Sequence, residues 1–468
     1  MTNSQAILRT EQLSYAYPQH GLGLATTDFV AEPGEVWAIT GRSGCGKSTF
    51  ARCLTGLIPH LYRGEMRGQV WVGNLNTRQT PLWRLCESVG MLFQNPMGQS
   101  LASSVEQEIL FGLESLELSL AERRARCEEY LERFQLVPLR RRRPDTLSGG
   151  EMQRVMLAAV LARQPGAVVL DEPLSMLDTT AATELSSYLG ELAQEGNTVV
   201  ACEHRADYLV CLPGCRQMQL SGEGGRQEQA LPPAPVHSAS EVRIRGLQLG
   251  FGRQELFRDL SLSLRGGEVM ALIGCNGVGK TTLLRALVGL HPYEGDIVAT
   301  DGRPVGFGLM FQNPDRQLFN PTVREEIRYR VPRPDETLYK WLLQALSLRT
   351  YEQVQPLLLS EGEKKRVALA TLLLRKPRHG VLLDEPTLGQ GDEHRAILGR
   401  VTRGLADAGS IVVAATHDLL WAVRYADRIT LLAPGRIAAD GPTQTVLKDR
   451  GAWAESGLVI PPWIPGAA

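Results

Sequence analysis

The chain has 468 residues, of which 43% are hydrophobic and 22% are charged, ordinary values for a globular protein that can bury a sizeable core in two to four domains. Fifty basic and 51 acidic side chains leave a net charge of −1, which gives no global reason to expect nucleic acid or an anionic membrane surface as a partner. The sequence lacks a run of about 20 uncharged apolar residues and a basic-then-apolar leader, and its eight cysteines are scattered, so we expect a chain in a reducing cytosol that does not itself cross a membrane.

Short, continuous apolar runs ending in polar residues predict buried parallel strands. In the first half they cover residues 36–39, 91–93, 167–170 and 198–201, with a helical stretch at 50–57. In the second half they cover residues 269–273, 309–311, 381–383 and 411–415, with a helical stretch at 282–290. This alternation predicts an α/β fold with mainly parallel sheets, in which the chemistry lies at the carboxyl ends of the strands.

The same four motifs occur twice, in the same order. A glycine-rich loop ends at Lys47 and again at Lys280, and the other three motifs recur at offsets of 218, 212 and 213 (312 − 94, 360 − 148 and 385 − 172). We interpret this as a tandem duplication rather than a short-period repeat. The predicted domains are residues 1–222 and 241–446, joined by a polar, proline-rich linker at 223–240. Residues 447–468 form a proline-rich tail, whose last part, 457–468, we expect to be a non-helical strap on the domain surface.

Both glycine-rich loops fit the pattern G-x-x-x-x-G-K-[ST] between a strand and a helix. Their backbone N–H groups can wrap a phosphate chain at a helix N-terminus, the lysine can reach the terminal phosphates, and the hydroxyl can bind Mg²⁺. An accidental glycine-rich turn is disfavoured because the pattern occurs twice in the same context. The candidate ATP-binding residues are Gly41, Arg42, Ser43, Gly44, Cys45, Gly46, Lys47, Ser48 and Thr49, and Gly274, Cys275, Asn276, Gly277, Val278, Gly279, Lys280, Thr281 and Thr282.

Acidic pairs follow the next apolar run of each copy. The first carboxylate, Asp171 or Asp384, suits Mg²⁺, and the second, Glu172 or Glu385, can accept a proton from an attacking water or orient it. A helix N-terminal charge cluster is the alternative interpretation. Histidines follow each glutamate by 32 residues, and these two, His204 and His417, are further catalytic candidates. Gln94 and Gln312 are also catalytic candidates, and their amide oxygens could contact Mg²⁺.

A glycine-containing turn opens a helix in each copy. Ser148 can cap the first of these helices, whose apolar residues from Met152 onward share one face. By itself this pattern indicates only a well-capped helix. The two signature segments comprise Ser148, Gly149, Gly150 and Glu151, and Ser360, Glu361, Gly362 and Glu363.

Taken together, these motifs resemble two ABC-type nucleotide-binding domains fused head to tail, over nearly the whole chain. The resemblance implies two tandem P-loop NTPase domains, each with a mainly parallel sheet, an antiparallel sheet and a helical subdomain, that hydrolyse ATP with Mg²⁺. It also implies that the domains pair and sandwich two ATP molecules, each held by one copy's glycine-rich loop and the other copy's signature. Tyr17 and Phe251 match the aromatic residue that stacks on adenine, and Tyr15 is the competing choice for Tyr17.

Two departures from the family pattern lie in the second copy. Glu361 stands where the signature should have its first glycine, and Gly391 stands where the following loop should have an aspartate, the counterpart of Asp178. A carboxylate at position 361 could repel a γ-phosphate or point away from it. Because both catalytic glutamates and both histidines are present, we expect the two sites to hydrolyse ATP at modestly different rates.

The segment from Asn313 to Glu326 resembles the helix by which energy-coupling factor importer ATPases grip their transmembrane subunit. The resemblance implies a peripheral protein on the cytoplasmic face of the cell membrane, with an integral membrane subunit and a small substrate-binding membrane subunit as partners, that drives uptake of a vitamin, vitamin precursor or metal ion. The alternatives are a tandem ATPase of a sugar-type importer and a soluble ABC ATPase acting in translation. Four consecutive arginines at 140–143 could suggest nucleic acid, but a solvated helix end is the simpler interpretation.

Overall fold

The computed structural model of the protein describes residues 8–18, 21–41, 45–93, 99–147, 149–174, 177–220, 241–251 and 254–466. Its contacts define two compact units, one of residues 1–177 and 181–225 and the other of residues 178–180 and 226–468. The predicted linker at 223–240 lies outside the described residues.

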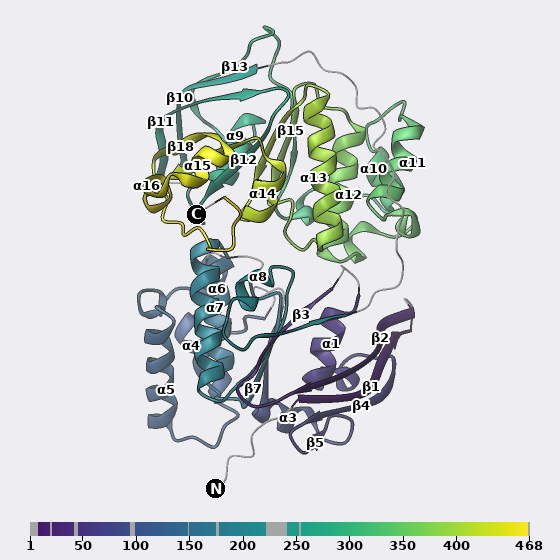
Figure 1. Cartoon of the computed structure of the whole chain (residues 1–468), viewed down its shortest axis with the longest axis vertical. Coiled ribbons are helices and arrows are strands. Elements are labelled where there is room, and N and C mark those ends of the chain that lie inside the picture. Colours follow the sequence, from purple (N-terminus) through teal and green to yellow (C-terminus); the bar gives the residue numbers. More distant parts are fainter. Residues whose placement is uncertain are drawn as a thin grey trace. The chain divides into compact units, whose positions relative to one another are not determined.

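Each unit contains one antiparallel and one mainly parallel sheet (Figure 1). In the first unit the antiparallel sheet has the order β2-β1-β4-β5 and the parallel sheet the order β6-β7-β8-β3-β9. The strands are β1 (Leu8–Tyr17), β2 (Gly21–Ala31), β3 (Val36–Thr40), β4 (Glu65–Val72), β5 (Leu75–Asn76), β6 (Val89–Leu92), β7 (Ala167–Asp171), β8 (Thr198–Cys202) and β9 (Arg216–Gln219). The helices are α1 (Lys47–Leu54), α2 (Leu57–His60), α3 (Leu82–Ser88), α4 (Val105–Leu113), α5 (Leu120–Arg133), α6 (Gly149–Leu161), α7 (Thr179–Gln194) and α8 (Asp207–Val210).

The second unit repeats this plan with a longer sheet. Its antiparallel sheet has the order β11-β10-β13, and its main sheet has the order β14-β15-β16-β12-β17-β18, in which only β18 is antiparallel to its neighbour. The strands are β10 (Glu241–Phe251), β11 (Gln254–Arg265), β12 (Val269–Gly274), β13 (Glu294–Ala299), β14 (Phe307–Met310), β15 (Gly380–Asp384), β16 (Ile411–Ala415), β17 (Arg428–Ala433) and β18 (Arg436–Pro442). The helices are α9 (Lys280–Leu287), α10 (Val323–Arg328), α11 (Glu336–Ala345), α12 (Glu361–Leu374), α13 (Asp392–Asp407), α14 (Leu419–Tyr425), α15 (Thr443–Lys448) and α16 (Arg450–Glu455).

The central strands are buried along their whole length. Every residue of β7, β8, β15 and β16 is buried, as expected for parallel strands covered on both faces. The predicted α/β fold, with two sheets in each copy, is therefore confirmed. In both copies the strand that leads into the glycine-rich loop lies beside the strand that ends before the histidine, as β3 does with β8 and β12 with β16.

The helices after the glycine-rich loops begin earlier than the apolar pattern predicted. They start at Lys47 and Lys280, three and two residues before the predicted starts, and end by Leu54 and Leu287. The early start is possible because Gly46 and Gly279 have φ angles of 100° and 110°, a left-handed conformation in which glycine avoids the strain of a side chain. The lysine thereby becomes the first residue of its helix.

The C-terminal tail contributes to the core of the second unit. Trp453 of α16 is buried, and so are Leu458 and Ile464 beyond it, which belong to the same hydrophobic cluster as strands β12 and β16. The last part of the tail is not helical, as predicted, but its apolar side chains are inserted into the unit rather than laid on its surface.

The run of four arginines is largely neutralised within the first unit. Arg140 pairs with Glu128 and lies 3.5 Å from Glu106, and Arg143 lies 2.6 Å from Asp145. These ion pairs use part of the charge of the run within the first unit, and the run itself follows a short 3₁₀ helix, Val137–Leu139, rather than the end of α5. Among the described residues, no helix is both long and apolar enough to cross a membrane.

Candidate active sites

The lysine of each glycine-rich loop is buried and turned back toward the loop. Lys47 Nζ donates to the Gly41 carbonyl at 2.9 Å, and Lys280 Nζ donates to the carbonyls of Gly274 at 2.6 Å and Cys275 at 3.1 Å. Burial lowers the pKa of Lys280. An ammonium group at the N-terminus of a helix is suited to a phosphate chain. Arg42, Ser43 and Gly44 lie outside the described residues.

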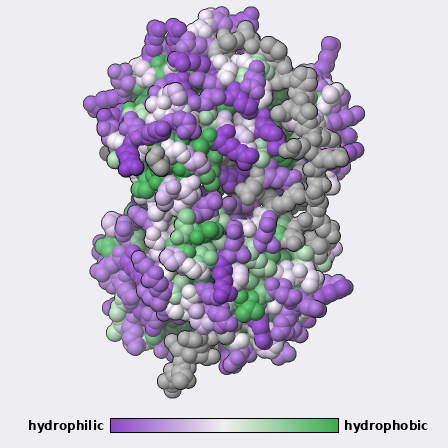
Figure 2. All heavy atoms as spheres, in the orientation of Figure 1, coloured by the Kyte–Doolittle hydropathy of each residue, from purple (hydrophilic) through white to green (hydrophobic). Residues whose placement is uncertain are grey.

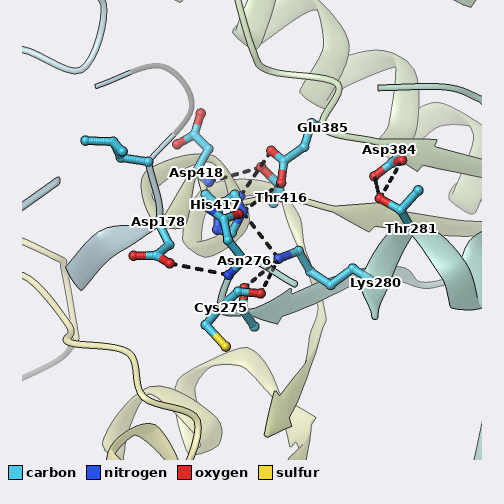
Figure 3. Close-up of polar contacts among 12 residues, drawn as sticks. Asp178, Cys275, Asn276, Lys280, Thr281, Asp384, Glu385, Thr416, His417 and Asp418 are labelled. Carbon is cyan, nitrogen blue, oxygen red and sulfur yellow. Dashed lines mark hydrogen bonds and ion pairs between the residues drawn. The ribbon is translucent and has the colours of Figure 1, made fainter. Parts of the chain in front are cut away.

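The hydroxyl group that follows each lysine contacts the aspartate at the end of a neighbouring strand. Ser48 Oγ donates to Asp171 at 3.1 Å, and Thr281 Oγ1 donates to both carboxylate oxygens of Asp384, at 3.1 and 2.9 Å (Figure 3). Burial, with the charge of Glu172 beside it, raises the pKa of Asp171 to about 6. Burial likewise raises the pKa of Asp384.

The structure brings each predicted glutamate to its predicted histidine. His204 Nε2 lies 3.3 Å from Glu172 Oε1, and His417 Nε2 lies 3.2 Å from Glu385 Oε1. They meet because the two residues extend from neighbouring parallel strands, β7 with β8 and β15 with β16. Burial, the largest cause, raises the pKa of Glu385 to about 7.

Both glutamates have an unusual backbone conformation. Their φ angles are 52° for Glu172 and 48° for Glu385, in the left-handed region that non-glycine residues rarely occupy and that costs on the order of 1–3 kcal/mol. The backbone N–H groups of both residues donate at 2.8 Å to carbonyls of the neighbouring strand, Cys202 in one copy and Ala415 in the other. The strain is the same in the two copies, and it turns each carboxylate toward the histidine.

In the second unit the histidine also contacts the lysine. Lys280 Nζ lies 3.2 Å from His417 Nε2 (Figure 3). One ring nitrogen cannot donate to Glu385 and accept from Lys280 at the same time. Whether Nε2 carries a hydrogen therefore decides which of the two neighbours it binds.

Only one of the two tyrosines proposed for adenine is accessible. Tyr15 is buried, and its hydroxyl donates to the Arg63 carbonyl at 2.7 Å. Tyr17 is partly exposed, packs edge-to-face against Tyr15, and has its hydroxyl 3.2 Å from both Thr49 Oγ1 and Arg52 Nη1. Tyr17 is thus the better placed of the two for stacking. The side chain of Phe251 lies outside the described residues.

The predicted glutamines and signature residues take different positions, where the structure describes them. Gln94 and Ser148 lie outside the described residues, and Gln312 is exposed after β14. Gly149, Gly150 and Glu151 open α6, with Glu151 Oε1 3.9 Å from Arg142. In the second unit Ser360 caps α12 in a capping box with Glu363. Glu361 is the first residue of α12 and is partly exposed, and the Gly362 carbonyl accepts from Gln390 at 2.8 Å.

The loop aspartate and its substitute occupy the same structural position. Asp178 directly precedes α7, which begins at Thr179, and Gly391 directly precedes α13, which begins at Asp392. The second copy therefore has a glycine where the first has a carboxylate, and its own aspartate has moved into the helix.

Several buried charged residues near the clusters were missed by the sequence analysis. Lys365, which is 2% exposed, donates to the Glu385 carbonyl at 2.7 Å. Glu203 is buried beside His204. Glu108 and Glu326, also buried, accept hydrogen bonds from the loops that follow the two glutamines. Aligning the two copies could have found them. Glu108 and Glu326 are counterparts at the offset of 218, so a glutamate is kept there in both copies. Lys365 and Glu203 have the uncharged counterparts Gln153 and Thr416.

Comparison with known proteins agrees with this geometry. The sequence profile of the ABC transporter family matches residues 24–175 and 257–388, one match in each unit and together more than half of the chain. The chain therefore belongs to the ABC transporter family as a tandem ATP-binding protein, and its two domains indicate ATP hydrolysis.

Relatives match over nearly their whole length. The chain is 30% identical over 526 residues to a "Putative HMP/thiamine import ATP-binding protein" of Bacillus subtilis, covering 97% of this chain and 95% of that protein. It is 30% identical over 551 residues to a "Putative ABC transporter ATP-binding protein" of Methanosarcina mazei, covering 98% and 93%. Among solved structures, one titled "RNase-L Inhibitor" has a TM-score of 0.67 at 21% identity, covering 96% of this chain and 93% of that one, a likeness of fold alone.

Proposed function

We propose that the chain is the ATP-hydrolysing subunit of an importer of the energy-coupling factor type, bound to the cytoplasmic face of the membrane through a separate transmembrane subunit. The solute would be a vitamin, a vitamin precursor or a metal ion, selected by a small substrate-binding membrane subunit. The two ATP-binding copies would pair with each other, as the family resemblance implies.

The strand-end clusters support the assignment of roles in hydrolysis. Glu172 and Glu385 would each orient the attacking water and accept its proton, and the neighbouring histidine would hold the carboxylate in position. Lys47 and Lys280 would neutralise charge on the terminal phosphates. A carboxylate whose pKa is raised by burial is suited to taking up a proton near neutral pH, as Glu385 illustrates.

The chemistry of the donor groups fits Mg²⁺. In each copy a hydroxyl oxygen and a buried carboxylate lie together, Ser48 with Asp171 and Thr281 with Asp384, and Mg²⁺ prefers oxygen ligands of these types. A bound cation would also relieve the cost of burying these carboxylates. When bound, Mg²⁺ would neutralise developing charge on the phosphates. Gln94 and Gln312 remain candidate Mg²⁺ ligands.

The observation that carries the transport proposal is an open apolar cavity in the second unit. The cavity measures about 510 Å³, and the segment Arg316–Phe319 lines one side of it. Phe319 is 62% exposed, packs edge-to-face on Tyr329, and its N–H donates to the buried Glu326 at 2.8 Å. The loop is thus held rigidly in a conformation that presents an aromatic side chain to solvent.

We infer that the occupant of this cavity is an amphipathic helical segment of the membrane subunit. An exposed aromatic beside an apolar hollow indicates a docking surface rather than an ordinary surface residue. The face of the protein shown in Figure 2 is largely hydrophilic, with separate apolar groups. In the first copy, Leu101 and Phe111 stand at the positions of Phe319 and Tyr329 (offset 218) and are 75% and 50% exposed, which supports a second, less aromatic docking surface.

Affinity purification of the tagged full chain from detergent-solubilised native membranes tests the proposal. We expect mass spectrometry to recover a multi-span subunit and a small membrane protein. Phe319→Glu should reduce that recovery at least about tenfold. The matched control Val298→Glu should not, since Val298 is 48% exposed on β13 and does not line the cavity. Equal recovery with both variants would contradict the docking surface.

The alternative role in translation makes a different prediction in the same experiment. Solved structures of similar fold include an archaeal ribosome recycling factor in complex with a ribosomal stalk protein, at 21% identity and a TM-score of 0.65. Recovery of ribosomal proteins without any membrane subunit would therefore overturn the transport proposal and leave the ATPase activity standing. A sugar-type importer would be indicated by a membrane subunit that is accompanied by no small substrate-binding membrane protein.

A further inference from the structure

The residues on either side of the histidine differ between the two copies. In the first copy His204 stands between Glu203 and Arg205, whereas in the second His417 stands between Thr416 and Asp418. A neutral hydroxyl thus replaces a carboxylate, and a carboxylate replaces a guanidinium group. Both flanking pairs are related by the same offset of 213 (416 − 203 and 418 − 205), so these are substitutions at matching positions.

Glu203 holds the histidine loop of the first copy through three backbone hydrogen bonds. Its side chain is buried, and the residue is 1% exposed. Its carboxylate accepts from the N–H groups of His204 at 2.7 Å and Arg205 at 3.0 Å, and from the N–H of Leu174 at 2.9 Å. Hydrogen bonds to a buried carboxylate are stronger than neutral ones. The loop carrying His204 is therefore tied to the segment that follows Glu172.

Arg205 ties the same two segments together from the other side. Its Nη1 donates to the carbonyls of Leu174 and Leu177, both at 2.8 Å, and its guanidinium lies 4.6 Å from the ring of Tyr208. Leu174 consequently donates to Glu203 and accepts from Arg205. The histidine loop is thus attached to the backbone of Leu174 and Leu177.

The second copy attaches its histidine loop in another way. The hydroxyls of Thr416 and Thr387 lie 3.2 Å apart, Thr387 being the counterpart of Leu174 (387 − 174 = 213). Asp418 lies 2.5 Å from Arg395 of α13 and accepts from the N–H of Trp421 in α14. The carboxylate of Asp418 therefore binds residues of two helices. The segment after Glu385 is joined to the histidine loop by the uncharged hydroxyls of Thr387 and Thr416.

We propose that Glu203 and Arg205 are positioning residues for ATP hydrolysis in the first copy. They hold His204 Nε2 at Glu172 Oε1 by tying the histidine loop to the backbone of Leu174 and Leu177. This inference rests on the proposed roles of Glu172 and His204. A small displacement of a reacting group costs rate much more than it costs substrate binding, so the effect should fall on kcat.

Steady-state ATPase assays of the full chain carrying Glu385→Gln test this inference, because the first copy is then the site left to hydrolyse ATP; in these assays the wild type is the first copy with its native residues. Arg205→Met removes both donors, and Glu203→Gln places an amide NH₂ against backbone N–H groups. Each should lower kcat at least about threefold, and no further than Glu172→Gln does, with the KM for ATP within about twofold. Arg205→Lys should recover most of the rate, because an ammonium group can still donate to the carbonyls of Leu174 and Leu177.

The matched control is Arg163→Met. Arg163 also donates to a backbone carbonyl of the first unit, that of Cys86 at 3.2 Å, and its loss should leave kcat within about twofold. The inference is overturned if Arg205→Met and Glu203→Gln retain wild-type kcat, or if Arg205→Lys fails to recover it while Arg163→Met is equally impaired. If Glu172→Gln and His204→Ala themselves retain full activity, the proposed function of the site fails instead.

Discussion

The two candidate ATP sites of this chain have the same kinds of proposed reacting groups but different buried charges around them. The distances from the histidine Nε2 to the glutamate Oε1 are 3.3 and 3.2 Å, and both glutamates have backbone φ angles in the left-handed region. The buried cation Lys365 donates to the backbone carbonyl of the second glutamate, and its counterpart in the first copy is the neutral, buried Gln153 (365 − 212 = 153). The buried anion Glu203 accepts from the backbone N–H of the first histidine, and its counterpart in the second copy is Thr416.

Duplication has therefore preserved the groups proposed to react, while the residues that hold them diverged. A buried charge near a carboxylate alters the pH at which that carboxylate ionises. The first copy has Glu203 and Arg205 beside its histidine, whereas the second has Thr416 and Asp418 there and Lys365 beside its glutamate. Two sites with the same kinds of reacting groups can thus hydrolyse ATP at different rates.

The largest effect is expected from replacing the two glutamates proposed to be catalytic. Glu172→Gln and Glu385→Gln keep the side-chain shape but remove the proton acceptor, so each should lower hydrolysis at its own site on the order of 100-fold. The activity left in each variant of the full chain is then that of the other site, and the two remaining activities should differ at least about threefold. Steady-state phosphate release measures both, and equal losses would show that the sites are functionally equivalent.

The next effect concerns the cation that only the second copy has. Burial raises the pKa of Glu385 to about 7, and Lys280 and Lys365 counteract that rise. Because the carboxylate form is needed, activity should fall as the pH drops below about 7. Lys365→Gln should raise the pKa further and shift this acidic limb of the pH–rate profile upward, by about one pH unit.

Lys364→Gln provides the control for this prediction. Lys364 is the neighbouring residue on α12 and pairs at 2.8 Å with the exposed Asp315 rather than with the catalytic segment. Its replacement should leave the acidic limb in place. An unchanged profile in Lys365→Gln would mean that the buried cation only supports the fold.

A smaller effect is expected on the stability of the nucleotide-free first copy. Burial and the charge of Glu172 raise the pKa of Asp171 to about 6, above the unfolded value near 3.9. The folded state therefore retains its proton more readily, so the associated stability is fully present below about pH 4 and is lost as the pH rises through about 6.

Asp171→Asn should accordingly be more stable than the wild type at pH 8, by about 1–3 kcal/mol, and no more stable at pH 4. Differential scanning calorimetry without nucleotide measures this as a higher Tm at pH 8. Asp145→Asn, which removes an exposed carboxylate paired with Arg143, should shift Tm by less than about 1 °C. A lower Tm for Asp171→Asn at pH 8 would contradict the pKa shift.

The smallest effect is expected from restoring the family glycine in the second signature. Glu361 is the first residue of α12 and is partly exposed, where a carboxylate interacts favourably with the helix dipole. Glu361→Gly should therefore change ATPase activity less than about twofold and lower stability by at most about 1 kcal/mol. A tenfold gain in activity would show that this carboxylate repels the nucleotide and is the main source of the asymmetry.

The sequence by itself determined the duplication, the α/β class and the residue types of the sites. Apolar runs such as 167–170 and 411–415 predict buried strands because a parallel strand covered on both faces must be continuously apolar. The glycine-rich loops and acidic pairs could be placed at strand ends for the same reason. Departures such as Glu361 and Gly391 were also visible, because one copy serves as the reference for the other.

Only the tertiary structure decided which of these residues meet and which charges support them. The contact between Glu172 and His204 depends on β7 lying beside β8, and the left-handed φ of Glu172 depends on its N–H bonding to Cys202. Tyr15 and Tyr17 cannot be distinguished in a strand pattern, yet one is core and the other accessible. Lys365 could not be singled out in the sequence, because no local periodicity indicates that its ammonium group reaches a backbone carbonyl at the end of a distant strand.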